Sequence, residues 1–411
     1  MAEKFKAPRG TFDVLPEQAA QRERLLQAAR EIFGLAGYRL IATPVFEDTA
    51  LFERGVGRST DIVRKEMFTF EDGGGRSITL RPEGTAPVCR AYLEHGMHRL
   101  AQPVKLWYAG SFFRYERPQE GRYRQFNQIG AEAIGSGSPL LDAEVVILLD
   151  GILRGLGIDR LKLKLSSLGS TAARMAYRDE LREYLRAHES DLSEEVRARI
   201  DLNPMRAFDS DHERTRGVMA GAPTLLERLE GEDAEHFAEV RALLDAAGVA
   251  YELDPTLVRG LDYYNRTLFE FDCDRLGAQS GVGGGGRYDG LIEMLGGPAT
   301  PAIGWAAGIE RILLAMEAPQ PQGSVEAFIV SAEQRERAFA LVLELRAAGI
   351  GADLDLAGRS FKGQMKQADR SGARAAVILE TDGTAKLRDM GSGEQREVDP
   401  ARIVDEIRAA S

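Results

Sequence analysis

The chain has 411 residues, of which 44% are hydrophobic and 28% charged, a composition that excludes a largely disordered, collagen-like or membrane protein. This length exceeds one ordinary domain, so we expect at least two hydrophobic cores. The net charge of -11 gives no overall attraction for nucleic acid, so any RNA contact has to come from local basic patches.

Cysteine usage and the N-terminus indicate the compartment. Cys89 and Cys273 are too few for a disulfide framework and favour a reducing environment. The N-terminal segment MAEKFKAPRG lacks the apolar stretch of a secretory signal, and the apolar stretch Ala143–Leu153 is short and interrupted by charge. We therefore expect a soluble, cytoplasmic protein without a membrane-spanning segment.

The first part of the chain begins with an amphipathic helix and continues with strands. Apolar residues recur at helical spacing over Pro16–Ala36, and the next strand-like run, Tyr38–Phe46, contains Pro44, which favours a sheet edge or an interface. Two β-hairpins are expected to follow, one formed by Phe68–Glu71 with Ser77–Leu80, and a longer one formed by Val104–Tyr115 with Arg124–Gly135. A helix at Pro139–Leu156 and a strand at Leu161–Ser166 come next.

The later segments predict two domains. Helical periodicity without strand signals indicates a helical insertion at about 171–250, before strand patterns return at Thr267–Cys273 and Ala302–Trp305. We expect one α+β domain with an antiparallel sheet at 1–318, a linker at 319–324, and a second domain at 325–411. The second domain alternates strands and helices, as in a small α/β domain with parallel strands: Ala327–Ser331, Ala332–Ala348, Ala352–Leu356, Phe361–Arg370 and Ala373–Leu379.

Two features suggest common sites and are rejected. Gly281, Gly283 and Gly286 fit the spacing of a dinucleotide-binding loop, but they lie late in the chain and follow no buried strand. We interpret this run as a turn or as backbone that approaches a ligand closely. His95 and His98 lack the spacing of a metal site, and no resident metal is expected.

Arginines in strands and loops are the strongest chemical signal. Arg114, Arg259 and Arg311 lie in separate segments, and each offers a charged planar fork that suits phosphate or carboxylate oxygens. Structural ion pairing is the alternative for each one. Glu83, Glu116 and Glu132 could neutralise these arginines, and they could also bind a cationic amine or an imidazole N–H.

At these residues the sequence resembles the histidyl-tRNA synthetases, a family of class II aminoacyl-tRNA synthetases. The resemblance covers essentially the whole chain in six segments. They are TPVFEDTALFERGVG (motif 1), ITLRPEGTAPVCRAY, FFRYERPQEGRYRQFNQIGAE (motif 2), LVRGLDYYNRTLFEF, SGVGGGGRYDGL and AIGWAAGIERILL (motif 3).

The resemblance implies a two-step ligase. Histidine and ATP would give histidyl-adenylate and pyrophosphate, and the histidyl group would then pass to the 3′ end of its tRNA. It implies that Arg114 and Arg259 bind the α-phosphate and that Arg311 holds the γ-phosphate, with Mg²⁺ on the β- and γ-phosphates. Such cations would supply the largest stabilisation of the transition state.

The resemblance also implies the substrate-binding residues. Adenine would stack on Phe126. The α-ammonium of histidine would be bound by Glu83, Thr85 and Gln128, the imidazole would be gripped by Glu132 and Tyr264, and Tyr263 and Tyr288 would line the pocket.

For tRNA, the resemblance implies that the motif 2 loop contacts the acceptor end, with Gln119 and Arg122 as the expected contacts. In the second domain, Lys362, Lys366 and Arg370 recur every four residues and share one helical face. This basic face is either a solvated surface or, as the family suggests, an anticodon-domain contact.

Two further expectations concern assembly and a rival function. Motif 1 forms a symmetric interface in class II enzymes, so a homodimer is expected. The alternative function is the regulatory, histidine-binding paralogue that serves as a subunit of ATP phosphoribosyltransferase. That paralogue typically lacks the C-terminal domain and loses the motif arginines, whereas this chain retains both.

Overall fold

The structure is a computed structural model that describes residues 5–57, 60–118, 121–258, 260–277, 280–316 and 325–409. The chain divides into two compact units, Met1–Ala318 and Pro319–Ser411, and each is described by itself. Among the described residues, no helix is both long enough and apolar enough to cross a lipid bilayer.

The first unit is built around an eight-stranded sheet with antiparallel pairing through its centre. The outermost pairs at the two edges are parallel. In spatial order the strands are β1 (Arg39–Leu40), β5 (Val104–Phe113), β6 (Gln125–Ile134), β11 (Ala302–Gly308), β10 (Gly281–Arg287), β9 (Asn265–Cys273), β7 (Leu161–Ser167) and β8 (Glu252–Leu253). Segments far apart in sequence therefore meet at the centre of the sheet.

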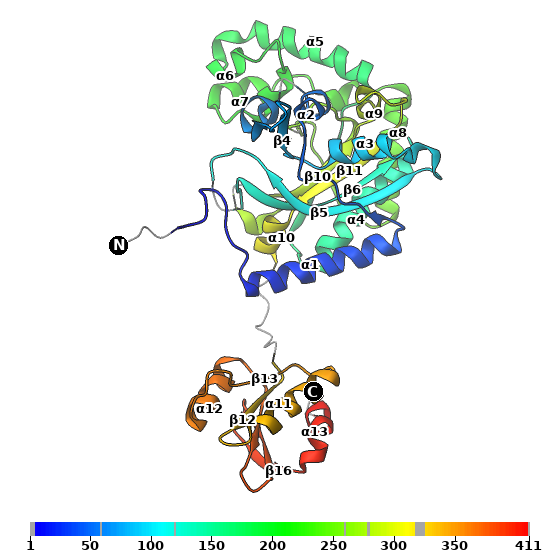
Figure 1. Ribbon diagram of the computed structural model, residues 1–411. Helices are drawn as coiled ribbons and strands as arrows, with labels where there is room; N and C mark the ends of the chain where they lie inside the picture. The colour runs from blue at the N-terminus through cyan, green and yellow to red at the C-terminus, as the bar shows by residue number, and fades with distance from the viewer. Residues whose placement is uncertain are drawn as a thin grey trace. The chain divides into compact units, whose positions relative to one another are not determined.

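Helices cover both faces of this sheet (Figure 1). One face is covered by α1 (Pro16–Leu35), α4 (Pro139–Gly155) and α10 (Ile309–Ala315). On α1 the buried residues are Leu25, Ala29 and Phe33, whose spacing of four places them on one side of the helix. The opposite face carries α2 (Thr49–Gly55), α3 (Thr85–Glu94), α9 (Leu291–Met294) and a small sheet of β2 (Phe46–Asp48), β4 (Ser77–Leu80) and β3 (Thr69–Glu71).

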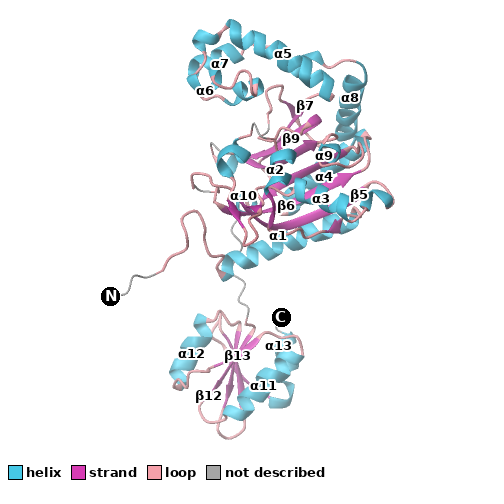
Figure 2. Cartoon of the chain, turned by 45° about the horizontal axis from the view of Figure 1, so that its top comes forward, coloured by secondary structure: helices cyan, strands magenta, loops and turns pink. Residues whose placement is uncertain are grey.

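The segment expected to form a helical insertion contains α5 (Thr171–Ala187), α6 (Glu194–Arg197), α7 (Glu213–Met219) and α8 (Gly231–Ala246). Figure 2 shows α5, α6 and α7 gathered at one end of the unit. α8 differs from them, because Phe237, Val240 and Leu244 belong to the hydrophobic core of the large sheet. The last helix of this segment is therefore part of the main core.

The interpretation of the glycine run as a turn is wrong, because Gly281–Arg287 is the strand β10. Gly285 pairs with Phe269 on one side and Trp305 on the other. A Cβ atom at Gly285 would lie 1.9 Å from the carbonyl oxygen of Gly304. The glycines let the central strands approach closely, which is a packing requirement that resembles a turn signal in the sequence.

The predicted strand Tyr38–Phe46 is also wrong as a single element, since it forms two short strands with Pro44 between them. The guanidinium of Arg81 explains the break. Its Nη1 donates to the carbonyl oxygens of Thr43 at 2.9 Å and Pro44 at 3.3 Å, so these groups bond to a side chain instead of a neighbouring strand.

The second unit is a five-stranded sheet ordered β13 (Ala352–Leu354), β12 (Ala327–Ser331), β14 (Ala375–Leu379), β15 (Ala385–Asp389) and β16 (Gln395–Val398). The parallel strands β13, β12 and β14 agree with the sequence pattern, whereas β15 and β16 are antiparallel additions that it missed. Its helices are α11 (Arg335–Ala347), α12 (Phe361–Arg370) and α13 (Ile403–Ala409).

Candidate functional site

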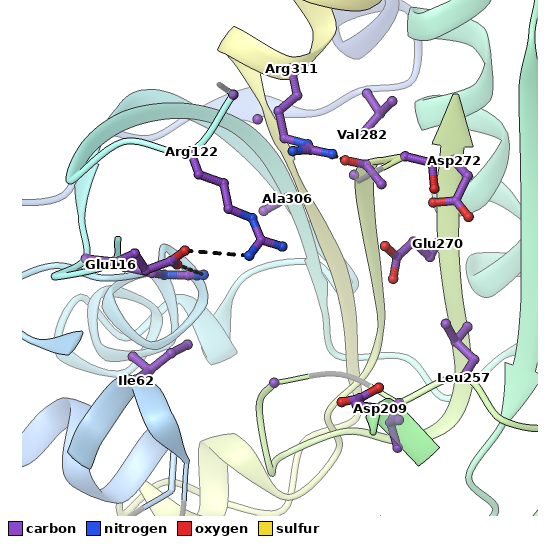
Figure 3. A pocket seen from close by; sticks show the side chains of 18 of the residues that line it. Ile62, Glu116, Arg122, Asp209, Leu257, Glu270, Asp272, Val282, Ala306 and Arg311 are labelled. Carbon is purple, nitrogen blue, oxygen red and sulfur yellow. Dashed lines mark hydrogen bonds and ion pairs between the residues drawn. The ribbon is translucent and has the colours of Figure 1, made fainter. Parts of the chain in front are cut away.

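A cleft of about 910 Å³ opens in the first unit, above the centre of the large sheet. Its lining includes basic, aromatic and acidic side chains, among them Arg114, Arg122, Arg206, Arg311, Lys164, Tyr123, Phe126, Phe208, Glu116, Glu270, Asp272 and Glu310. In Figure 3, Arg122 and Arg311 extend into this cleft from different elements, while Glu270 and Asp272 project from β9. The cleft thus combines cations, acidic oxygens and a flat apolar surface.

Arg114 directly follows β5, and its side chain is held on two sides. Its Nε donates to the carbonyl oxygen of Pro82 at 2.9 Å, and its guanidinium lies 5.3 Å from the centre of the Phe126 ring. Its Nη1 is 3.8 Å from the carboxylate of Glu116. These contacts fix the direction of the positive charge before a ligand binds.

Arg311 lies in α10, and its Nε donates to the carbonyl oxygen of Gly281 at the start of β10. Burial lowers the pKa of Arg311, and the positive charge of Arg122 lowers it further. Two like charges that line one cleft repel each other, and an anion between them would offset this cost. The pair therefore favours a polyanionic ligand.

Two predicted residues, Arg259 and Gln119, lie outside the described residues. Val258 and Gly260, the chain neighbours of Arg259, both line the cleft. Of the arginines expected to bind the triphosphate, Arg114 and Arg311 meet in the same cleft.

A buried cluster in the first unit surrounds the carboxyl group of Glu132 on β6, which has no exposed surface. Three hydroxyl groups donate to it: Tyr288 at 2.5 Å, Thr85 at 2.8 Å and Tyr108 at 3.3 Å. Burial raises the pKa of Glu132 to about 8, although the hydroxyl donors act in the opposite direction. A carboxyl group in such surroundings can exchange a proton near neutral pH.

Glu83 is the second buried carboxyl group of the cluster. It accepts from the backbone N–H groups of Thr85 at 2.7 Å and Ala86 at 2.9 Å, at the start of α3, and from the Tyr263 hydroxyl at 3.5 Å. Burial raises the pKa of Glu83, and the two backbone donors partly oppose this. The Tyr263 ring lies 4.7 Å from that of Tyr264 and 5.7 Å from that of Tyr288, centre to centre.

Of the residues expected to bind histidine, Gln128 lines the open cleft, while the others lie in the buried cluster. The carbonyl oxygen of the Gln128 side chain is buried and has no hydrogen-bond partner among the described residues. A buried acceptor without a partner costs free energy, so this atom fits a ligand N–H. Gln128 lies on β6 four residues before Glu132, so the two side chains are on the same face of that strand.

Sequence reasoning missed Tyr108, whose ring occupies space left by two glycines. A Cβ atom would lie 2.4 Å from the Tyr108 ring at Gly84 and 2.3 Å from it at Gly130. Gly130 is the direct cross-strand partner of Tyr108 in the β5–β6 hairpin. A large aromatic residue opposite a glycine was the available signal.

Sequence reasoning also missed Arg287, which fixes the backbone next to Tyr288. Its side chain has no exposed surface, and it pairs with Asp142 at 2.7 Å and Asp289 at 2.9 Å. Because the glycine run was interpreted either as a turn or as backbone close to a ligand, nothing in the pattern indicated that Arg287, its last residue, would be buried.

No group of three or more histidine, cysteine or acidic side chains in the described part of the chain could hold a metal ion. Mg²⁺ often uses only one or two carboxylates, with phosphate and water completing its shell. Glu270 and Asp272 supply carboxylate oxygens of this kind in the cleft.

The basic residues Lys362, Lys366 and Arg370 are exposed on α12 of the second unit. Gln364 and Ala368, on the same helix, are buried. The basic residues therefore form one solvent-facing side of α12, as the spacing of four predicts.

Comparisons with known proteins cover both units. A family model described as "Histidyl-tRNA synthetase" matches residues 10–312, and one described as "Anticodon binding domain" matches residues 325–410. A histidine--tRNA ligase of Rubrobacter xylanophilus is 50% identical over 96% of each chain, and one of Streptomyces avermitilis is 49% identical over 98% of this chain and 99% of its own.

Two solved structures are informative. The crystal structure of an apo histidyl-tRNA synthetase of S. aureus has a TM-score of 0.83 and 37% identity, and the match covers 98% of this chain and 100% of that chain. A structure from Bacillus halodurans C, titled as an ATP phosphoribosyltransferase regulatory subunit/histidyl-tRNA synthetase, has a TM-score of 0.68 and 25% identity over 92% of this chain and 99% of its own.

Proposed function

The chain belongs to the histidyl-tRNA synthetase family, and from this premise we propose how its cleft and buried cluster ligate histidine to tRNA. The observation that carries the proposal is the meeting of Arg114 and Arg311, from separate segments, in one cleft whose lining includes Gln128, on the same strand β6 as the buried Glu132. This arrangement fits a triphosphate beside a small polar amino acid.

In the first step, a carboxylate oxygen of histidine attacks the α-phosphorus of ATP, a new C–O–P linkage forms, and pyrophosphate leaves. Two anions approach each other, so preorganised cations lower the barrier. Arg114 binds the α-phosphate, Arg311 holds the γ-phosphate, and adenine stacks against Phe126. Arg259 also contacts the α-phosphate, and it contacts the substrate carboxylate, as the family resemblance implies.

Mg²⁺ supplies charge neutralisation on the β- and γ-phosphates when it is bound. Glu270 and Asp272 are the carboxylates of the cleft that would hold it. Lys164 lies 2.9 Å from Asp272, which orients this carboxylate at the edge of the cleft.

Histidine is recognised by the buried cluster. Glu83, Thr85 and Gln128 accept from the α-ammonium group, while Glu132 and Tyr264 bind the two ring nitrogens. Tyr263 and Tyr288 form the walls. An amino acid of similar shape that lacks the ring N–H cannot donate this hydrogen bond to Glu132, which disfavours its binding.

In the second step, a terminal hydroxyl group of the tRNA attacks the carbonyl carbon of the adenylate, the ester forms, and AMP leaves. Arg122, with Gln119 in the same loop, contacts the acceptor end. The exposed basic side of α12 contacts the anticodon region of the tRNA. Its local positive charge attracts phosphate groups although the chain as a whole is negatively charged.

We propose a homodimer in the cytoplasm. Leu40, Val45 and Phe46 in the motif 1 region are large apolar residues with 58%, 44% and 49% of their surface exposed. A symmetric contact with a second copy would cover them. A ligase of protein synthesis is expected in the compartment where tRNA is used.

The regulatory paralogue is the weaker candidate. The similar structure whose title includes a regulatory subunit has 25% identity, while curated ligases reach 50% and the anticodon-binding model matches residues 325–410. A charging assay separates the two functions. Purified protein with ATP, labelled histidine and tRNA is expected to give labelled tRNA that requires ATP, and a protein that binds histidine without charging tRNA would contradict the proposal.

A further inference from the structure

The segment that carries Tyr263 and Tyr264 is bonded to the helical insertion as well as to the sheet. Arg174 on α5 donates through Nη1 to the backbone carbonyl oxygens of Asp262 at 2.6 Å and Tyr264 at 2.7 Å. Asn203 of the insertion donates to the Asp262 carboxylate at 3.1 Å. One guanidinium nitrogen thus bridges the backbone on both sides of Tyr263.

The C-terminal end of this segment is held at the base of the insertion. Arg266 has a φ of 45°, which lies in the left-handed region. This conformation is unfavourable for any residue that carries a side chain. Its N–H donates to the carbonyl oxygen of Gly169 at 2.7 Å, and its own carbonyl oxygen accepts from Leu168 at 2.7 Å. Its Nε lies 3.3 Å from Asp233 of α8. These contacts fix the backbone immediately after the two tyrosines.

The apolar packing is continuous between the two regions. Tyr177, Leu181 and Leu185 of α5 belong to the same buried cluster as the site tyrosines Tyr263 and Tyr264. A displacement of α5 would therefore shift Tyr263 and Tyr264 through packing contacts within this cluster.

The contact depends on the guanidinium group of Arg174, which donates hydrogen bonds to two backbone carbonyl oxygens. Burial lowers the pKa of the partly buried Arg174 side chain, and carbonyl oxygens accept its N–H groups. Removal of the guanidinium would leave two backbone carbonyl groups without this donor, and backbone that loses such a bond tends to shift toward water.

We propose that Arg174 is a positioning residue for histidine recognition, through which the helical insertion sets the places of Tyr263 and Tyr264 in the pocket. The inference rests on the proposed function, because it assigns the tyrosines to the histidine pocket. Arg174 acts through the backbone and has no assigned contact with substrate. The residues assigned to ATP, Arg114, Phe126 and Arg311, lie on other segments, where Arg114 bonds to Pro82 and lies over the Phe126 ring, and Arg311 bonds to Gly281.

The test is steady-state ATP–pyrophosphate exchange with the full chain carrying Arg174→Met, which keeps an unbranched apolar side chain but is shorter and removes the N–H donors. The matched control is Arg178→Met. Arg178 lies one turn later on α5 and donates at 2.8 Å to the carbonyl oxygen of Leu202, within the insertion itself. Thermal unfolding of each variant shows whether the fold is retained.

Arg174→Met is expected to raise the KM for histidine about tenfold or more, with the KM for ATP within twofold of wild type, whereas Arg178→Met leaves both unchanged. A wild-type KM for histidine in Arg174→Met would overturn the inference. So would an equal rise of the KM for ATP, or an equal effect of Arg178→Met.

Arg174→Lys decides the question if Arg174→Met does not fold. The shorter ammonium group cannot bridge both carbonyl oxygens in the same way, so the KM for histidine is expected to rise at least threefold with the KM for ATP unchanged. An unchanged KM for histidine would overturn the inference. If wild-type protein shows no histidine-dependent exchange, the proposed function fails and this inference fails with it, whereas an active wild type with a normal Arg174→Met variant contradicts this inference alone.

Discussion

Glu132 shows how burial and hydrogen bonds at one residue set its protonation. Its pKa is raised to about 8 by burial, in spite of hydroxyl donors on both carboxyl oxygens. In the unfolded chain the same group would ionise near its ordinary value of 4.5. Between these values the folded protein keeps a proton that the unfolded chain releases, so rising pH lowers the free energy of unfolding.

Glu132→Gln removes this titration while preserving shape. We therefore expect the free energy of unfolding of the variant, relative to wild type, to increase with pH from about 4.5 to about 8, by up to about 1.4 kcal/mol per pH unit. Urea unfolding across this pH range measures it. Glu23→Gln on the exposed side of α1 is the control and should show no such trend. A pH-independent difference for Glu132→Gln would contradict the assigned protonation.

The positive charge of Arg114 in the cleft is expected to contribute to adenylate formation. Arg114→Gln keeps a polar side chain but removes the fixed cation beside Phe126, so we expect adenylate formation to fall about 100-fold. The KM for histidine should stay within a few-fold. Pyrophosphate exchange measures both quantities.

The control for this prediction is Arg124→Gln. Arg124 is a nearby arginine that lies over the Tyr115 ring at 3.8 Å and is not among the residues that line the cleft. Equal losses in the two variants would indicate that the effect is structural and would remove Arg114 from its role.

At the scale of elements, β10 is the strand that the cleft depends on, because it joins the β9 carboxylates to the β11 segment that leads to Arg311. Its glycines leave no room for side chains. At Gly285 a Cβ atom would meet both Gly304 and Trp305 of β11, at 1.9 Å and 2.6 Å. At Gly34, in α1, a Cβ atom would meet nothing within 4 Å.

These two glycines predict opposite effects of the same substitution. Gly285→Ala is expected to destabilise the protein by more than about 3 kcal/mol, since rigid backbone must move to accommodate the methyl group. Gly34→Ala should stabilise it by about 0.5 kcal/mol, because it reduces the freedom of the unfolded chain at an open helical position. Chemical denaturation of both variants provides the measurement, and similar effects at the two sites would refute this account of β10.

The elements also show what sequence could and could not predict. The hairpins around β3–β4 and β5–β6, and the alternation in the second unit, follow from local patterns of apolar and turn residues. The strand character of Gly281–Arg287 could not be predicted, because it arises from neighbours β9 and β11 rather than from its own side chains. β15 and β16 were missed because their exposed faces carry few apolar residues.

The same distinction holds for the site. Arg114 and Arg311 could be predicted from their chemistry and the family motifs, and they line one cleft. Arg174 could not be predicted, because it acts through the backbone of Asp262, far away in sequence, whereas the only signal for Tyr108 was a large aromatic residue opposite Gly130 in the predicted hairpin. Only the folded chain brings these groups together.

At the scale of the whole molecule, activation and tRNA binding are expected to depend on different units. Lys366→Glu reverses a charge on the exposed side of α12, in the second unit, while the cleft lies in the first. We expect the KM for tRNA in aminoacylation to rise several-fold, with histidine activation unchanged. The salt dependence of charging should also become weaker, since a phosphate contact is lost. A normal KM for tRNA would show that this side of α12 is only solvated.

We propose that one cleft holds ATP next to the buried residues that bind histidine. Histidine-dependent ATP–pyrophosphate exchange on the purified chain tests it most directly. We expect rapid exchange that requires histidine and is not supported by other amino acids at the same concentration. Absence of exchange with saturating histidine and ATP, or equal exchange with an amino acid that lacks the imidazole ring, would contradict it.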